Sequence, residues 1–137
     1  MRRRGWTLLE LVVVLTIVGT GLALAVPPLW HLRDRWLARR ARDDLVLLLT
    51  AARWRAQVSG RAVVVGLGAD GLATAEQPGW RLVRALEAAY GTTLRANRPS
   101  LVYRADGLAA GAANLTAVVG RGAVAETVRV SRLGRVR

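Results

Sequence analysis

Residues 6–26 form a run of 21 residues that are apolar, Gly or Thr, with the single exception of Glu10. As an α-helix this run would be about 31 Å long, close to the roughly 30 Å hydrocarbon core of a bilayer. Three arginines and Gly5 precede it. The N-terminal segment is therefore expected to be a targeting signal or a membrane-spanning helix.

Three interpretations of this segment are open. A Sec signal peptide would use the arginines as its charged end and be cleaved after residues 23–25, Ala-Leu-Ala, which have the required A-x-A form. A twin-arginine signal would rest on the paired arginines alone. A retained membrane helix would keep the apolar run and lose only the short basic leader before it.

Glu10 favours the retained helix. A carboxylate near the centre of an apolar helix costs roughly 2.5–3.5 kcal/mol on insertion, and a signal peptide gains nothing from that cost. If the chain is cut after Gly5, the new amino group of Trp6 lies four residues before Glu10 and can pair with it, in the same chain or in a neighbour. The alternative is that Glu10 only extends to the membrane surface.

The N-terminus resembles a known motif. Arg-Arg-Arg-Gly at residues 2–5, followed by Trp-Thr-Leu-Leu-Glu-Leu and a long aliphatic run, is similar to the prepilin cleavage and methylation motif of type IV pilins and type II secretion pseudopilins. The resemblance implies a prepilin peptidase that cuts after Gly5 and methylates the amine of Trp6. It implies that Glu10 pairs with a neighbouring subunit during assembly on an inner-membrane platform, and that Pro27 kinks the helix. Trp6 departs from the family pattern, which usually has Phe.

This resemblance implies a cleaved leader at residues 1–5, a membrane and fibre-core helix at residues 6–28, and a periplasmic domain at residues 29–137. The charge count opposes that orientation. Five arginines at residues 33–42 outnumber the three in the leader, and the positive-inside rule would place the body in the cytoplasm. Pilin-type processing requires a cytoplasmic leader, so we assign the body to the periplasm, with the protein as a single-pass inner-membrane precursor.

Beyond the membrane segment the helix is expected to continue. Apolar residues at helical spacing predict one buried stripe, and they are Leu45, Leu48, Leu49, Ala52 and Ala56. Ser59-Gly60 is expected to end the helix. The stripe should cover one face of a sheet, because it is too short for a coiled coil of several heptads.

The remaining residues are typical of a small antiparallel β-sheet. Strands are predicted at residues 62–67 and 101–104, with Asp-Gly turns following them, and a hairpin at residues 115–119 and 124–131 with its turn at 120–122. The spacing of Trp80, Val83, Leu86 and Tyr90 predicts a short helix. The fold class is therefore α+β, a long N-terminal helix packed on a small antiparallel sheet in one domain.

Composition argues against an enzyme. The chain has no Cys and all 21 basic residues are Arg, so it has no thiolate nucleophile, no disulfide and no Schiff-base lysine, and His31 is the single His. We expect no metal or cofactor. Residues 66–71 spell G-x-G-x-x-G after a strand, but Pro78-Gly79 interrupts the helix that a dinucleotide site would need. We predict a hairpin turn there.

The body extends the resemblance. Ala51-Ala52-Arg53 in the amphipathic helix, a strand after Arg61 and a Gly-Arg ending after an Asp-Gly hairpin resemble the GspH/FimT branch of minor pseudopilins. The resemblance implies a subunit at or near the tip of a type II secretion pseudopilus, assisting protein export with other pseudopilins. One alternative is a FimT-like minor type IV pilin that binds DNA for uptake. The other is a secreted protein with an ordinary Sec signal.

The C-terminus carries the candidate DNA-binding residues. The formal charge is +12, and residues 129–137 contain four arginines and no acidic residue. Gly134-Arg135-Val136-Arg137 resembles the Gly-Arg-x-Arg ending associated with DNA contact, so Arg132, Arg135 and Arg137 are expected to bind phosphates without reading bases. In the opposing interpretation, Gly-Arg only closes the last strand and the arginines reflect genome composition.

Overall fold

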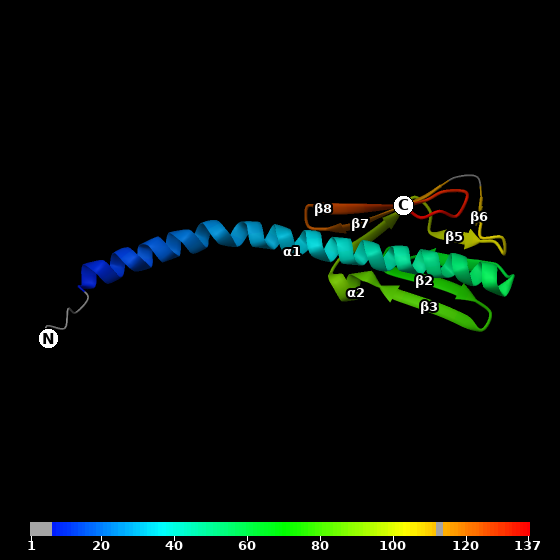
Figure 1. Cartoon of the computed structure of the whole chain (residues 1–137), viewed down its shortest axis with the longest axis horizontal. Helices are drawn as coiled ribbons and strands as arrows, with labels where there is room; N and C mark the ends of the chain where they lie inside the picture. Colours follow the sequence, from blue (N-terminus) through cyan, green and yellow to red (C-terminus); the bar gives the residue numbers. More distant parts are fainter. Residues whose placement is uncertain (1–6, 112–113) are drawn as a thin grey trace. The chain divides into compact units, whose positions relative to one another are not determined.

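The computed structural model describes residues 7–111 and 114–137, with the side chains of residues 24–29 left out (Figure 1). The contacts divide the chain into two compact units, Met1–Arg33 and Asp34–Arg137. One helix, α1 (Leu8–Ser59), has residues in both units.

In the first unit, every described side chain of α1 is exposed. The hydroxyls of Thr16 and Thr20 donate to the carbonyl oxygens of Val12 and Thr16, both at 2.7 Å, so neither hydroxyl depends on water for a partner. Across the part of the chain that the structure describes, no helix combines the length and the apolar character needed to cross a membrane.

In the second unit, the predicted stripe of α1 is the buried face of the helix. Its five residues are fully buried, namely Leu45, Leu48, Leu49, Ala52 and Ala56. The opposite face exposes Trp36, Leu47 and Trp54. The helix ends at Ser59 as expected, and the next residue, Gly60, has a positive φ of 64°.

Two antiparallel sheets and a short helix complete the second unit (Figure 1). The elements after α1 are β1 (Val63–Leu67), β2 (Leu72–Gln77), β3 (Trp80–Ala85), α2 (Leu86–Tyr90), β4 (Thr93–Ala96), β5 (Ser100–Tyr103), β6 (Ala109–Ala110), β7 (Leu115–Arg121) and β8 (Val124–Val130). The strand order is β3-β2-β1-β5-β6 in one sheet and β4-β7-β8 in the other. Buried residues of both sheets join the α1 stripe in one hydrophobic cluster.

The predicted fold class is confirmed: a long N-terminal helix packs on antiparallel strands. One small sheet was expected, whereas the structure has two, because β4 pairs with β7 instead of extending the sheet around β1. The G-x-G-x-x-G segment is a hairpin turn between β1 and β2, as predicted. The Gly68 N–H donates to the carbonyl of Leu72 at 2.8 Å, and the Leu72 N–H donates to Asp70 Oδ1 at 3.1 Å.

The predicted helix over residues 80–90 is wrong in its first half. Residues 80–85 form β3, which pairs with β2 from Gln77↔Trp80 to Leu72↔Ala85, and the helix covers residues 86–90 alone. The two residues between the strands, Pro78 and Gly79, explain this. Gly79 has a φ of 78°, and Pro followed by Gly with positive φ suits a tight turn that leads directly into a strand. The hydrogen bonds between β3 and β2 thus stabilise a strand at residues 80–85, although the apolar residues there have helical spacing.

The hairpin of β7 and β8 is confirmed, but its turn is shorter than expected. Arg121 belongs to β7 and pairs with Val124, so the turn consists of Gly122 and Ala123. Side chains alternate along β8, since Val128 and Val130 are buried while Thr127 and Arg129 are exposed.

Candidate assembly motif and nucleic-acid interface

Glu10 lies in the first turn of α1, and Thr7 lies just before the helix. The Glu10 N–H donates to Thr7 Oγ1 at 3.3 Å, and the Leu11 N–H donates to the Thr7 carbonyl at 3.2 Å. Thr7 is therefore the N-cap and Glu10 the third helical residue. Among the residues that the structure describes, none donates a hydrogen bond to the Glu10 carboxylate.

Three other N-terminal residues were predicted to be functional, namely Gly5, Trp6 and Pro27. Gly5 and Trp6 lie outside the described residues. Pro27 lies inside α1, whose backbone is helical on both sides of it, and its side chain is not among those described. Cleavage after Gly5, methylation of Trp6 and the kink at Pro27 stay predictions.

At the other end of the chain, Arg135 and Arg137 lie on a segment that folds back along β8. Arg129 and Arg137 exchange two backbone hydrogen bonds of 2.8 Å each, and Val130 and Val136 form an antiparallel bridge. The Ser131 N–H donates to the Arg135 carbonyl at 2.9 Å. Residues 135–137 thus continue the β4-β7-β8 sheet at its β8 edge.

Gly134 makes this return possible. Its N–H donates to the Ser131 carbonyl at 2.9 Å and its φ is 72°, as in a three-residue hairpin loop that ends in a left-handed residue. A Cβ on Gly134 would collide with the carbonyl oxygen of Gly107. That oxygen also accepts a hydrogen bond from Arg53 Nε of α1 at 3.1 Å. Gly134 therefore allows the chain to reverse direction after β8.

The arginines around this loop form what we call the arginine edge: Arg129, Arg132, Arg135 and Arg137. Arg129 and Arg137 are directly opposite each other, and Arg135 is two residues before Arg137, so these three leave the sheet on the same face. Arg132 lies in the loop. All four are exposed.

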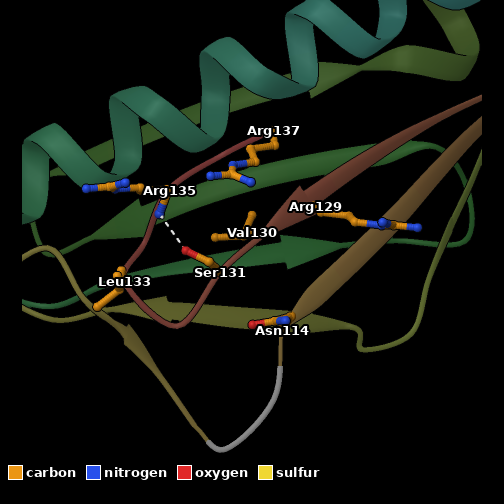
Figure 2. Close-up of a pocket in the computed structure, with 7 residues that line it drawn as sticks. All are labelled: Asn114, Arg129, Val130, Ser131, Leu133, Arg135 and Arg137. Carbon is orange, nitrogen blue, oxygen red and sulfur yellow. Dashed lines mark hydrogen bonds between the residues drawn. The ribbon is translucent and has the colours of Figure 1, made fainter.

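Three residues of the arginine edge, Arg129, Arg135 and Arg137, line an open cavity of about 510 Å³ together with Asn114, Ser131 and two apolar residues (Figure 2). The Arg135 N–H donates to Ser131 Oγ at 3.3 Å, which holds the returning segment on β8. Within the described residues, none of the four arginines forms an ion pair, whereas Arg81, Arg104 and Arg121 each pair with a carboxylate. The edge is a concentrated positive charge with donors available to phosphate.

Comparison with known proteins adds two findings. A family model described as the prokaryotic N-terminal methylation motif matches residues 1–26. Two crystal structures of the type IV minor pilin FimU of Pseudomonas aeruginosa are similar to the chain. One has 18% identity and a TM-score of 0.62, covering 76% of this chain and 89% of that one. The other has 17% identity and a TM-score of 0.58, covering 72% and 90%. The chain has the pilin fold.

No curated protein sequence matches this pilin-like chain at a significant level. The matched motif contains Gly5, Trp6 and Glu10, the residues expected to carry cleavage, methylation and assembly, and Pro27 lies one residue beyond it. The chain thus combines the N-terminal methylation motif with the pilin fold.

Two functional features were missed from the sequence of the pilin-like chain. Arg129 was not a candidate, although the alternation Arg-Val-Arg after Gly134 indicates a strand that could return along β8. Thr7 was not a candidate either, although Thr-x-x-Glu before an apolar run is the spacing of a helix capping box.

Proposed function

We propose that this pilin-like chain is a minor subunit of a pilin-type fibre, made as a single-pass inner-membrane precursor with its body in the periplasm. The observation that carries the proposal is a prepilin-type methylation motif joined to a pilin fold in one chain. The partners would be the prepilin peptidase, an inner-membrane assembly platform and the other minor pilins or pseudopilins of the fibre.

The exposed surface of the first unit supports this proposal. Leu8, Leu15 and Ile17 are 83%, 61% and 66% exposed, and the other described apolar side chains before residue 24 are also uncovered. A helix that is apolar on all sides is stable where lipid or other protein covers it. The membrane would cover it in the precursor, and neighbouring helices would cover it in the fibre.

Mass spectrometry of the membrane-extracted protein tests the processing step. We expect a mature chain that begins at Trp6 and carries a methylated amine. A mature chain that begins at Val26 would instead establish the secreted protein with a Sec signal and overturn the fibre proposal.

Glu10→Ala tests the assembly step. Removing the carboxylate leaves the amine of a neighbour unpaired in a medium of low dielectric, so incorporation into fibres is expected to fall while cleavage continues. Thr20→Ala, further along the same helix, is the matched control and should incorporate normally. Normal incorporation of Glu10→Ala would show that Glu10 only extends to the membrane surface.

Two fibres use subunits of this kind. FimU is described as a type IV minor pilin, which supports a type IV pilus as the home of this chain. The resemblance of the body to the GspH/FimT branch supports the tip of a type II secretion pseudopilus as the second candidate. Deletion of the gene is expected to reduce piliation in the first case and export of folded proteins in the second.

A second function, binding of DNA, is favoured by the arginine edge. Four exposed arginines without an ion pair among the described residues can bind phosphates without reading bases. We expect residues 29–137 to bind duplex DNA of any sequence, with affinity that falls by about 0.9 in log–log slope for each phosphate contact as salt rises.

Paired double variants test that binding. Arg135→Ala with Arg137→Ala should reduce the salt slope by nearly two contacts. Arg61→Ala with Arg84→Ala removes the same charge away from the edge and should change the slope little. Absence of binding at low salt, or equal binding by both double variants, would overturn DNA binding by the arginine edge.

A further inference from the structure

The side chain of Thr7, which was not among the predicted site residues, holds the start of α1. Thr7 Oγ1 accepts the N–H of Glu10, and the Thr7 carbonyl accepts the N–H of Leu11. We propose that Thr7 is the positioning residue of the assembly site: it fixes where the helix begins and thereby where the Glu10 carboxylate lies relative to the processed end of the chain. This inference rests on the proposed assembly role of Glu10.

The physical reason is the cost of an open helix end in an apolar medium. The first N–H groups of a helix have no partner within it, and each unpaired group costs several kcal/mol in hydrocarbon. A Thr hydroxyl at the N-cap satisfies one of them, here that of Glu10. Without this acceptor, α1 could lose its first turn or begin at another residue.

The residue at which α1 begins matters because Glu10 lies in the first turn of the helix. Thr7 and Glu10 have the spacing of a capping box, in which the acidic residue lies three positions after the N-cap, near the beginning of the helix. In the proposed mature chain one residue, Trp6, separates the free amine from Thr7. The cap therefore keeps the carboxylate near the end of the helix where amines of processed subunits would meet it.

Four substitutions at Thr7 separate capping from size and shape. Thr7→Ser and Thr7→Asn keep an N-cap acceptor, whereas Thr7→Val has nearly the shape of Thr without the hydroxyl, and Thr7→Ala removes both. Thr16→Val is the matched control, because its hydroxyl donates to a carbonyl within the helix instead of accepting an N–H.

The first readout is amide hydrogen exchange of the full chain in detergent micelles, followed by NMR. We expect the Glu10 amide to exchange about five-fold faster in Thr7→Val and Thr7→Ala than in the unchanged chain, the size that a typical cap implies. Thr7→Ser, Thr7→Asn and Thr16→Val should retain protection. Equal protection of the Glu10 amide in Thr7→Val and Thr7→Ser overturns the proposal.

The second readout is incorporation into fibres, measured as the fraction of cleaved chain so that any effect on the peptidase is removed. Incorporation is expected to fall in Thr7→Val and Thr7→Ala and to be preserved in Thr7→Ser and Thr7→Asn. Faster exchange with unchanged incorporation overturns the positioning role of Thr7. Failure of the proposed function is distinct, because Glu10→Ala would then incorporate normally whatever Thr7 does.

Discussion

Arg121 Nε donates to Oδ1 of Asp34 at 2.8 Å, which joins two residues 87 positions apart in the chain. The same guanidinium donates to the carbonyl oxygens of Tyr90 and Gly91, at the C-terminal end of α2. One side chain at the end of β7 thus holds α1 and α2. Both partners of the ion pair are mostly covered, with side chains 22% and 30% exposed.

We expect Arg121→Ala to lower the free energy of unfolding of residues 29–137 by about 1.5–3 kcal/mol, because it leaves Asp34 and two carbonyls without a charged donor. The measurement is urea unfolding. Arg104→Ala is the control, since its pair with Asp106 is exposed and should cost less than about 0.5 kcal/mol. Equal losses in the two variants would contradict a structural role for Arg121.

Neighbouring leucines on α1 test its buried face. Leu48 is fully buried, whereas Leu47 is 60% exposed. We expect Leu48→Ala to cost about 2–5 kcal/mol, because it leaves a cavity between helix and sheets. Leu47→Ala should change the free energy of unfolding by less than about 0.5 kcal/mol. Similar costs for both, by urea unfolding, would mean that α1 packs with another face.

Local features of this chain are predictable from its sequence, whereas contacts between distant segments are not. The buried face of α1 follows from the local spacing of Leu45, Leu48 and Leu49, and the N-terminal motif is likewise contiguous, so both were predicted. The pairing of β3 with β2 and of β4 with β7 depends on contacts between distant segments, which local spacing does not report. The return of Arg137 along β8 depends in addition on the space beside Gly107.

Gly134→Ala is expected to destabilise the body by about 1–3 kcal/mol, because Ala must adopt a left-handed conformation and its Cβ meets the Gly107 carbonyl. Gly79→Ala is a matched control: Gly79 has a φ of 78° but open space around its Cβ position. It should cost less, about 1 kcal/mol. Urea unfolding of the two variants compares the costs, and a smaller loss for Gly134→Ala would contradict the close approach to Gly107.

Stability should fall in alkali through Tyr103. Burial raises its pKa from 10.0 to about 12, and its buried hydroxyl has no hydrogen-bond partner among the described residues. The folded state therefore holds this proton more tightly than the unfolded state. The contribution of protonated Tyr103 to the free energy of unfolding is therefore complete below pH 10 and is lost as the pH rises toward about 12. It amounts to at most roughly 3 kcal/mol.

The midpoints of urea unfolding at about pH 9, 10.5 and 11.5 measure this loss. The first value lies below the ordinary Tyr pKa of about 10, and the other two lie above it. Tyr103→Phe should be as stable as the parent at pH 9, or more so, because it removes an unpaired buried hydroxyl. It should also lose less stability in alkali. Tyr103→Phe should still lose some stability in alkali through Tyr90, because the hydrogen bond from Tyr90 to the Asp44 carboxylate raises the pKa of Tyr90 as well. If Tyr103→Phe loses as much stability in alkali as the parent, Tyr103 is not the residue responsible.

The returning segment after Gly134 also determines what β8 offers to other chains. An edge strand with free N–H and C=O groups is a template for pairing with a strand of another chain. Backbone groups of Arg129 and Ser131 are already paired with Arg137 and Arg135. The segment thus occupies this edge of β8 and shields the sheet from edge-to-edge aggregation.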